Sequence, residues 1–195
     1  MRLIFWVRIP VFEIYQGPRN IFVLSETSTM QEKSESLILS EVFQDVRGLT
    51  KFYLSLAKAL DPHLQFELNG QKLNTLYWLA GHLTWSQHFL LVEALTGETM
   101  GIQWLDRFEM GTILTDEPGL PTFEEILIAM DRVHHHAMAS ILALDDSGLD
   151  APNHRGIAFQ GEDSKRVVIR HAIRHEPCHT GQIGWLLKLH GQETV

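Results

Sequence analysis

Four long segments of this chain repeat apolar residues with a helical period, and residues that start or stop helices bound each of them. They cover about residues 34–60, 74–97, 122–148 and 163–190. Pro62 follows the first segment, and Asn74 and Gly97 fit the start and end of the second. Thr122 and Glu125 match a capping box at the start of the third. No stretch shows sustained strand alternation, so the sequence predicts an all-α four-helix bundle.

The first 29 residues differ from the rest. Their apolar stretch is interrupted by Arg8, Pro10 and Glu13, so it is too short to span a bilayer and lacks the apolar core of a signal peptide. We therefore expect residues 1–29 to form an extension outside the bundle, or a short strand, and residues 30–195 to form one domain.

Charge and cysteine content narrow the function classes. The formal charge is -8 and the isoelectric point is about 5.7, which disfavours nucleic-acid binding because that requires clustered Lys and Arg. The single cysteine, Cys178, excludes an internal disulfide and fits a reducing compartment, so a cytoplasmic protein without membrane spans is expected.

Successive residues of an α-helix lie about 100° apart around its axis, and this spacing places three histidines on the apolar faces of two predicted helices. On the fourth helix, His175 and His179 share a stripe with Val168, Ala172, Ile183 and Leu186. On the second, His82 shares a face with Trp78, Leu79, Trp85 and Phe89, with Ala80 and Leu91 on the far side. All three imidazoles are therefore predicted to point into the bundle.

Buried imidazoles need partners for both ring nitrogens, and a metal ion satisfies one of them. A pair at positions i and i+4, joined by a third histidine from a facing helix, suits a divalent cation. We predict that His82, His175 and His179 bind such a cation and leave a position open for water or substrate. Because the imidazole must be neutral, affinity should weaken as the pH falls below about 6.5.

The stretch HEPCH, residues 175–179, also fits the HExxH pattern of zinc proteases. The extended protease pattern requires glycine and histidine where this chain has Gln182 and Trp185. Pro177 removes a backbone donor and is expected to kink the helix between the two histidines. A zinc protease is therefore disfavoured.

Further residues near the predicted site have alternative interpretations. Glu176 could act as a base or orient an imidazole, or it could be a solvent or interhelix carboxylate. His134 could support the site, but a core-edge histidine is favoured, and His171 is an outer candidate. Cys178 is favoured as a small buried packing residue over a nucleophile or ligand. His135 and His136 are expected in solvent.

The connection of residues 97–121 is long and carries Trp104 and Phe108. It could form a lid or pocket wall. It could equally be the plain crossover that parallel second and third helices would need.

Two stretches, LNTLYWLAGHLTW and RHEPCHTGQIGWLLKLHG, resemble the second-helix and fourth-helix motifs of the DinB/YfiT-like family. The resemblance covers roughly residues 34–191 and departs from the family pattern at Pro177 and Cys178. It implies an up-down-down-up bundle, a metal triad of His82, His175 and His179, and frequent homodimers. Zinc or nickel is implied for many members, with iron or manganese as alternatives.

The family that the chain resembles includes mycothiol-dependent maleylpyruvate isomerases and bacillithiol transferases. Together with the open metal position, the resemblance favours a metal-dependent enzyme of thiol S-transferase or hydrolase type, acting on a small molecule such as a low-molecular-weight thiol. The alternative is a non-catalytic, dimeric metal-binding module of a stress response. No residue identifies the substrate.

Overall fold

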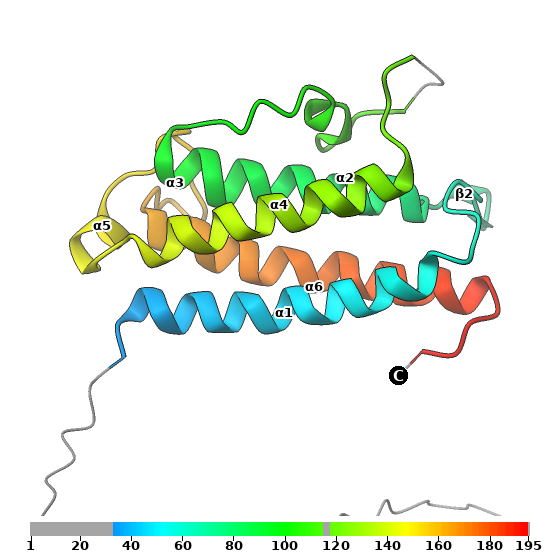
Figure 1. Cartoon of the computed structure of the whole chain (residues 1–195), viewed down its shortest axis with the longest axis horizontal. Helices are drawn as coiled ribbons and strands as arrows, with labels where there is room; N and C mark the ends of the chain where they lie inside the picture. The colour runs from blue at the N-terminus through cyan, green and yellow to red at the C-terminus, as the bar shows by residue number, and fades with distance from the viewer. Residues whose placement is uncertain (1–32, 115–117, 195) are drawn as a thin grey trace, which may run out of the picture. The chain divides into compact units, whose positions relative to one another are not determined.

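A computed structural model of the chain describes residues 33–114 and 118–194, and the predicted extension of residues 1–29 lies outside them. The long helices are α1 (Glu35–Ala57), α2 (Leu76–Gln87), α4 (Phe123–Leu142) and α6 (Lys165–Leu189) (Figure 1). A π-helical segment, η1 (His88–Glu93), and the short α3 (Ala94–Thr96) prolong α2. The predicted all-α four-helix bundle is therefore confirmed.

Smaller elements join the long helices. They are an antiparallel hairpin of β1 (Glu67–Leu68) and β2 (Gln71–Lys72), a 3-10 helix η2 (Leu105–Phe108) and a short helix α5 (Asp146–Asp150). None of these was expected from the periodicity, because each is too short to repeat a pattern.

The helices follow the up-down-down-up order that the resemblance implied. Helices α1 and α6 are parallel, α2 and α4 are parallel, and α1 and α4 are antiparallel (Figure 1). The contacts that fix these directions join Glu35 to Arg166, Thr50 to Thr180, Tyr77 to Pro121, Gln87 to His134, and Lys51 to Asp131. Parallel α2 and α4 require a long crossover between them.

Side-chain caps explain where the helices begin. The N-caps of the four long helices are Ser34, Thr75, Thr122 and Ser164, and each side chain accepts a bond from a backbone N–H of the first turn. The capping box of Thr122 and Glu125 is confirmed. Asn74 was predicted as the second cap, but the cap is Thr75, one residue on. The end predicted at Gly97 is confirmed, and its φ of 80° is the left-handed conformation that glycine favours.

Burial around α2 differs from the prediction. Ala80 and Leu91 were placed on the far side of this helix, yet both are fully buried (0% exposed). The reason is that α2 and η1 pack against α4 and α6, and η2 covers another part of α2. The side of α2 that carries Ala80 and Leu91 is therefore buried rather than exposed to solvent. Its tryptophan side is the more open one, because Trp78 and Trp85 are only half-buried.

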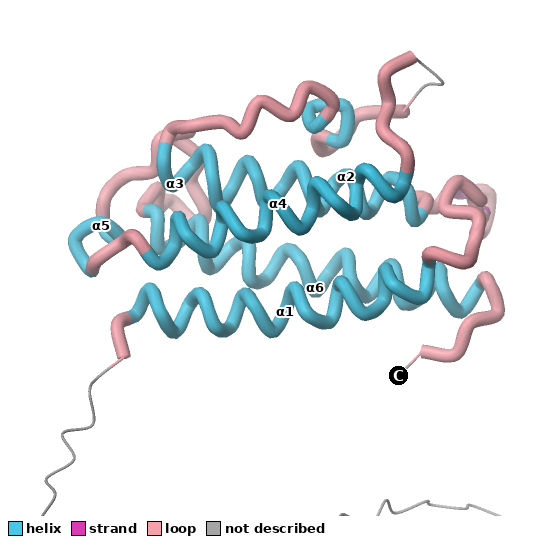
Figure 2. The backbone as a smooth tube through the Cα atoms, viewed as in Figure 1, coloured by secondary structure: helices cyan, strands magenta, loops and turns pink. Residues whose placement is uncertain are grey.

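Two further features concern the path of the chain. Helix α6 continues through Pro177, which is exposed; the kink expected there stays a prediction. The described parts of the 97–121 connection lead from α3 over α2 toward α4 (Figure 2), and η2 anchors them through the buried side chains of Leu105 and Phe108. Among the described residues, no helix has the length and apolar character that crossing a membrane requires.

Candidate metal centre

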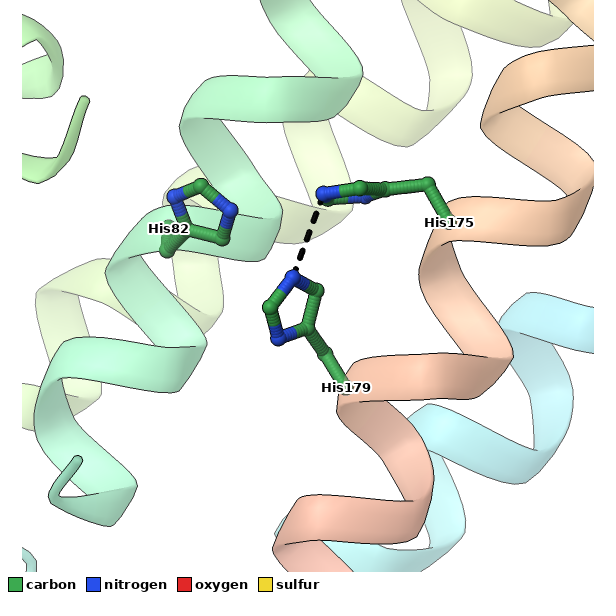
Figure 3. Close-up of side chains that lie close together, drawn as sticks. All are labelled: His82, His175 and His179. Carbon is green, nitrogen blue, oxygen red and sulfur yellow. Dashed lines mark hydrogen bonds between the residues drawn. The ribbon is translucent and has the colours of Figure 1, made fainter. Parts of the chain in front are cut away.

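The three histidines predicted to bind a cation lie together between α2 and α6. One ring nitrogen from each of His82, His175 and His179 falls within 4.8 Å of the other two. Figure 3 shows His82 on one helix facing the two histidines of the other. Helical spacing explains this arrangement, because residues four apart project from the same face of α6.

The α6 histidines are already close to the spacing of two ligands on one ion. The Nε2 atoms of His175 and His179 are 3.1 Å apart. Two nitrogens that are each about 2.0–2.1 Å from a tetrahedral zinc ion would lie about 3.3–3.4 Å apart. In the metal-free protein one of these nitrogens carries a hydrogen that bridges to the other, and a cation would replace that hydrogen.

The ring of His82 is oriented by the 97–121 connection. Its Nδ1 lies 2.9 Å from the backbone oxygen of Phe108, so Nδ1–H donates to that carbonyl and Nε2 keeps its lone pair. The approach of Phe108 depends on Gly81, because a Cβ at that position would lie 2.1 Å from Phe108 Cδ1. The connection joins two parallel helices, residues such as Asp106 and Glu109 line a pocket, and Phe108 supports a candidate ligand.

His179 has a similar support within its own helix. Its Nδ1 lies 3.0 Å from Oε1 of Gln182, one turn further along α6, so Nδ1–H donates to the amide oxygen. This role of Gln182 was not predicted, although residues three apart on a helix are neighbours and the spacing of His179 and Gln182 indicates a contact. The role of the Phe108 carbonyl had no such signal, since backbone atoms are the same in every residue.

Burial keeps two of the candidate ligands neutral. It lowers the pKa of His82 to about 4, partly offset by the Phe108 carbonyl and reinforced by His179. It lowers the pKa of His175 to about 3, with further contributions from His179, His82 and His171. Because a neutral imidazole is the ligating form, protons compete with a cation for these two rings only at pH values well below the 6.5 expected from a free imidazole.

Aromatic side chains line the site, in which His82 is buried and His175 and His179 are half-buried. The ring of Trp78 stacks on His82 at 4.6 Å, and Trp85 lies on the same ring at 5.6 Å. His171 stacks on Phe159 at 3.7 Å and lies 5.7 Å from His175. His171 is therefore an outer neighbour of the triad, in agreement with its predicted place.

Glu176 faces away from the three histidines. Its side chain is buried and its Oε2 lies 2.8 Å from Nη2 of Arg47 on α1. Of the alternatives for this residue, the structure shows the interhelix carboxylate, and the predicted catalytic role does not fit. The physical reason is that the residue after His175 projects about 100° around the helix from it.

The structure also shows the positions of Cys178 and of the three consecutive histidines in α4. Cys178 is exposed, so the prediction of a buried packing residue is wrong; it lies on the solvent side of α6. His134 is a buried core histidine, bonded to Gln87 and Gln44, while His135 and His136 are exposed, as predicted.

Comparison with protein-family models gives a match over most of the chain. The family model of the DinB superfamily matches residues 52–183, a range that includes His82, His175 and His179. No curated protein matches the chain. No solved structure matches it either. Because the matched range covers well over half of the 195 residues, the chain belongs to the DinB superfamily.

Proposed function

We propose that this protein is a metal-dependent enzyme of thiol S-transferase or hydrolase type, with zinc or nickel as the first choice of cation and iron or manganese as alternatives. The observation that carries the proposal is the convergence of three histidine nitrogens within 4.8 Å. Three protein ligands leave at least one coordination position for a substrate or water, which is the pattern of catalytic sites.

Different residues would have different roles at such a site. His82, His175 and His179 would hold the cation, and the Phe108 carbonyl and Gln182 fix two of the rings so that their Nε2 lone pairs face the other histidines. A divalent cation supplies Lewis acidity, which turns a thiol or a water molecule into a nucleophile near neutral pH. Trp78 and Trp85 limit the access of bulk water to His82.

A pocket that reaches Gln182, the hydrogen-bond partner of His179, supports a small-molecule substrate, and none of the three histidines themselves lines it. It has a volume of about 650 Å³ and lies between the β1–β2 hairpin and the end of α6. Gln182, which bonds His179, lines it together with Leu79, Trp185 and Leu186. An apolar pocket with a few polar groups next to a reactive centre is typical of substrate sites.

The rival proposal is a non-catalytic metal-binding module that acts as a homodimer. Helix α1 favours a dimer through an exposed apolar stripe of Ile38, Val42, Leu49 and Phe52. A set of only three protein ligands and the pocket lined by Gln182 favour the enzyme, since a structural site needs neither a vacant position nor a pocket.

Elemental analysis of protein purified without an affinity tag tests the metal. We expect about one divalent cation per chain in the wild type and in His135→Ala, which removes an exposed histidine outside the site. His175→Ala and His179→Ala should lose most of it, because each removes one of three ligands. Equal metal content in all four proteins would end the proposal of this site.

Activity separates the two proposals. The metal-loaded wild type and His82→Ala are compared in thiol conjugation to chlorobimane with glutathione, bacillithiol and mycothiol, and with ester and amide substrates. The enzyme predicts turnover that His82→Ala loses. If neither protein turns over any substrate and His82→Ala only unfolds at lower temperature, the non-catalytic module is the better account.

A further inference from the structure

Each candidate ligand on α6 is followed by a residue that α1 holds in the core. His175 is followed by Glu176, whose Oε2 lies 2.8 Å from Nη2 of Arg47. His179 is followed by Thr180, whose hydroxyl lies 2.7 Å from that of Thr50. All four contacting side chains are buried. We name Arg47, Thr50, Glu176 and Thr180 the α1–α6 clamp.

Helix geometry links this clamp to the triad. Glu176 and Thr180 are four residues apart, so they share one face of α6, about 100° around the helix from His175 and His179. A rotation of α6 that moved the imidazoles away from His82 would also pull Glu176 and Thr180 away from α1. The same seam continues at Gly184, where an added Cβ would lie 3.2 Å from Tyr53, so the two helices are close.

Stability alone gives little reason for an ion pair in this position. Arg47 is fully buried (0% exposed), and its Nε and Nη1 have no hydrogen-bond partner among the described residues. Burial of two charges is so costly that an apolar pair of similar volume is often as stable or more stable. What a directional ion pair adds is a fixed geometry between two helices.

We infer that the α1–α6 clamp is a positioning device that sets the rotation of α6 and so aims His175 and His179 at the cation shared with His82. Arg47 and Glu176 are thus positioning residues and touch neither cation nor substrate. The inference rests on the proposed function only in taking the three histidines as metal ligands.

The test uses the full chain and Co²⁺ as the probe, because cobalt absorption in the visible range reports both affinity and coordination geometry. The main variant is Arg47→Met/Glu176→Leu, which removes both charges and keeps the core filled. Glu35→Gln is the matched control, since it weakens another α1–α6 ion pair, between Glu35 and Arg166, away from the histidines. Urea unfolding of the metal-free proteins measures stability separately.

We expect the double variant to be as stable as the wild type or more stable. Its affinity for Co²⁺ should fall about 10–100-fold, the usual effect of losing an outer support of metal ligands, with a changed absorption spectrum. Glu35→Gln should keep wild-type affinity and spectrum. A double variant with wild-type affinity and spectrum would overturn the inference, because the ion pair would then be structural only.

A second variant covers the case in which the first does not fold. Thr50→Val/Thr180→Val replaces the buried hydroxyl pair by methyl groups of the same shape, which is nearly neutral for stability. It should also bind Co²⁺ more weakly, and unchanged affinity in whichever double variant is folded rejects the clamp. A wild type that binds no Co²⁺ at all would reject both the clamp and the proposed metal site, whereas binding that is indifferent to the clamp rejects only the inference.

Discussion

Gly81 lies beside His82 and leaves room for the ring of Phe108 on the surface of α2. An alanine Cβ at this position would lie 2.1–2.5 Å from three atoms of that ring, so Phe108 would have to move. Its backbone oxygen is the group that holds Nδ1 of His82 at 2.9 Å. A single methyl group should therefore affect the candidate metal centre through a residue that is not a ligand.

We predict that Gly81→Ala lowers the free energy of unfolding by about 1–3 kcal/mol, the usual cost of overpacking a core. Metal affinity should fall as well, because the ring of His82 loses its orienting bond. Urea unfolding and a competitive zinc titration measure the two effects. Gly48→Ala is the control, since a Cβ there meets nothing within 4 Å; it should gain up to about 1 kcal/mol and leave metal affinity unchanged. Wild-type zinc affinity in Gly81→Ala would contradict the role assigned to Phe108.

Sequence reasoning found the candidate ligands but not the groups around them. The helical period brought His175 and His179 to one face of α6 and placed His82 on the apolar face of its own helix, and the packing of the bundle brings the two helices together. The role of Glu176 stayed open in the sequence, because a neighbour in sequence need not share a helix face, and the structure shows the interhelix carboxylate. The Phe108 carbonyl comes from a connection 26 residues away, and only the folded path of that connection places it.

Among the elements, the four long helices were predictable because caps and periodicity agree over many residues. The π-helical segment η1 was not, since a single wider turn is too short to show a period of its own in the sequence. Within it, Nδ1 of the buried His88 lies 3.1 Å from Oε1 of Glu93, a contact between residues five apart. The prediction placed the solvent-facing side of α2 wrongly. A helix that is covered on most sides has no polar face, so its sequence does not show which side is exposed.

Pro177 provides a prediction about α6. Its ring lacks an N–H, so the helix forgoes the bond to the carbonyl of Ile173. Pro177→Ala restores that donor at an exposed position and should raise the free energy of unfolding of the metal-free protein by about 1–3 kcal/mol. Gly181→Ala, also exposed and with nothing within 4 Å of its Cβ, reports the gain from helix propensity alone, about 0.5–1 kcal/mol. A Pro177→Ala gain no larger than that of Gly181→Ala would show that the proline does not interrupt the helix.

For the whole molecule, the helix order was implied by the family resemblance, whereas no sequence pattern predicted the buried polar contacts between helices. His134 of α4 is the clearest case: Nδ1 lies 2.9 Å from Nε2 of Gln87, and Nε2 lies 2.7 Å from Oε1 of Gln44. Burial, with Arg47 and Lys51 nearby, lowers the pKa of His134 to about 4. Such a histidine joins three helices in its neutral form and makes the fold sensitive to acid.

Acid is expected to destabilise the metal-free bundle through its buried histidines. His134, His82 and His175 have folded pKa values of about 4, 4 and 3, below the unfolded value near 6.5, so unfolding takes up protons between these limits. Their stabilising contribution is therefore complete above about pH 6.5 and is lost as the pH falls toward 4. His134→Gln keeps a polar side chain but removes one titrating group, so it should be less stable than the wild type at pH 7. That difference should shrink steadily between pH 6.5 and 4.5 in urea unfolding of the metal-free proteins. A difference that stays constant over this range would show that His134 takes up no proton on unfolding.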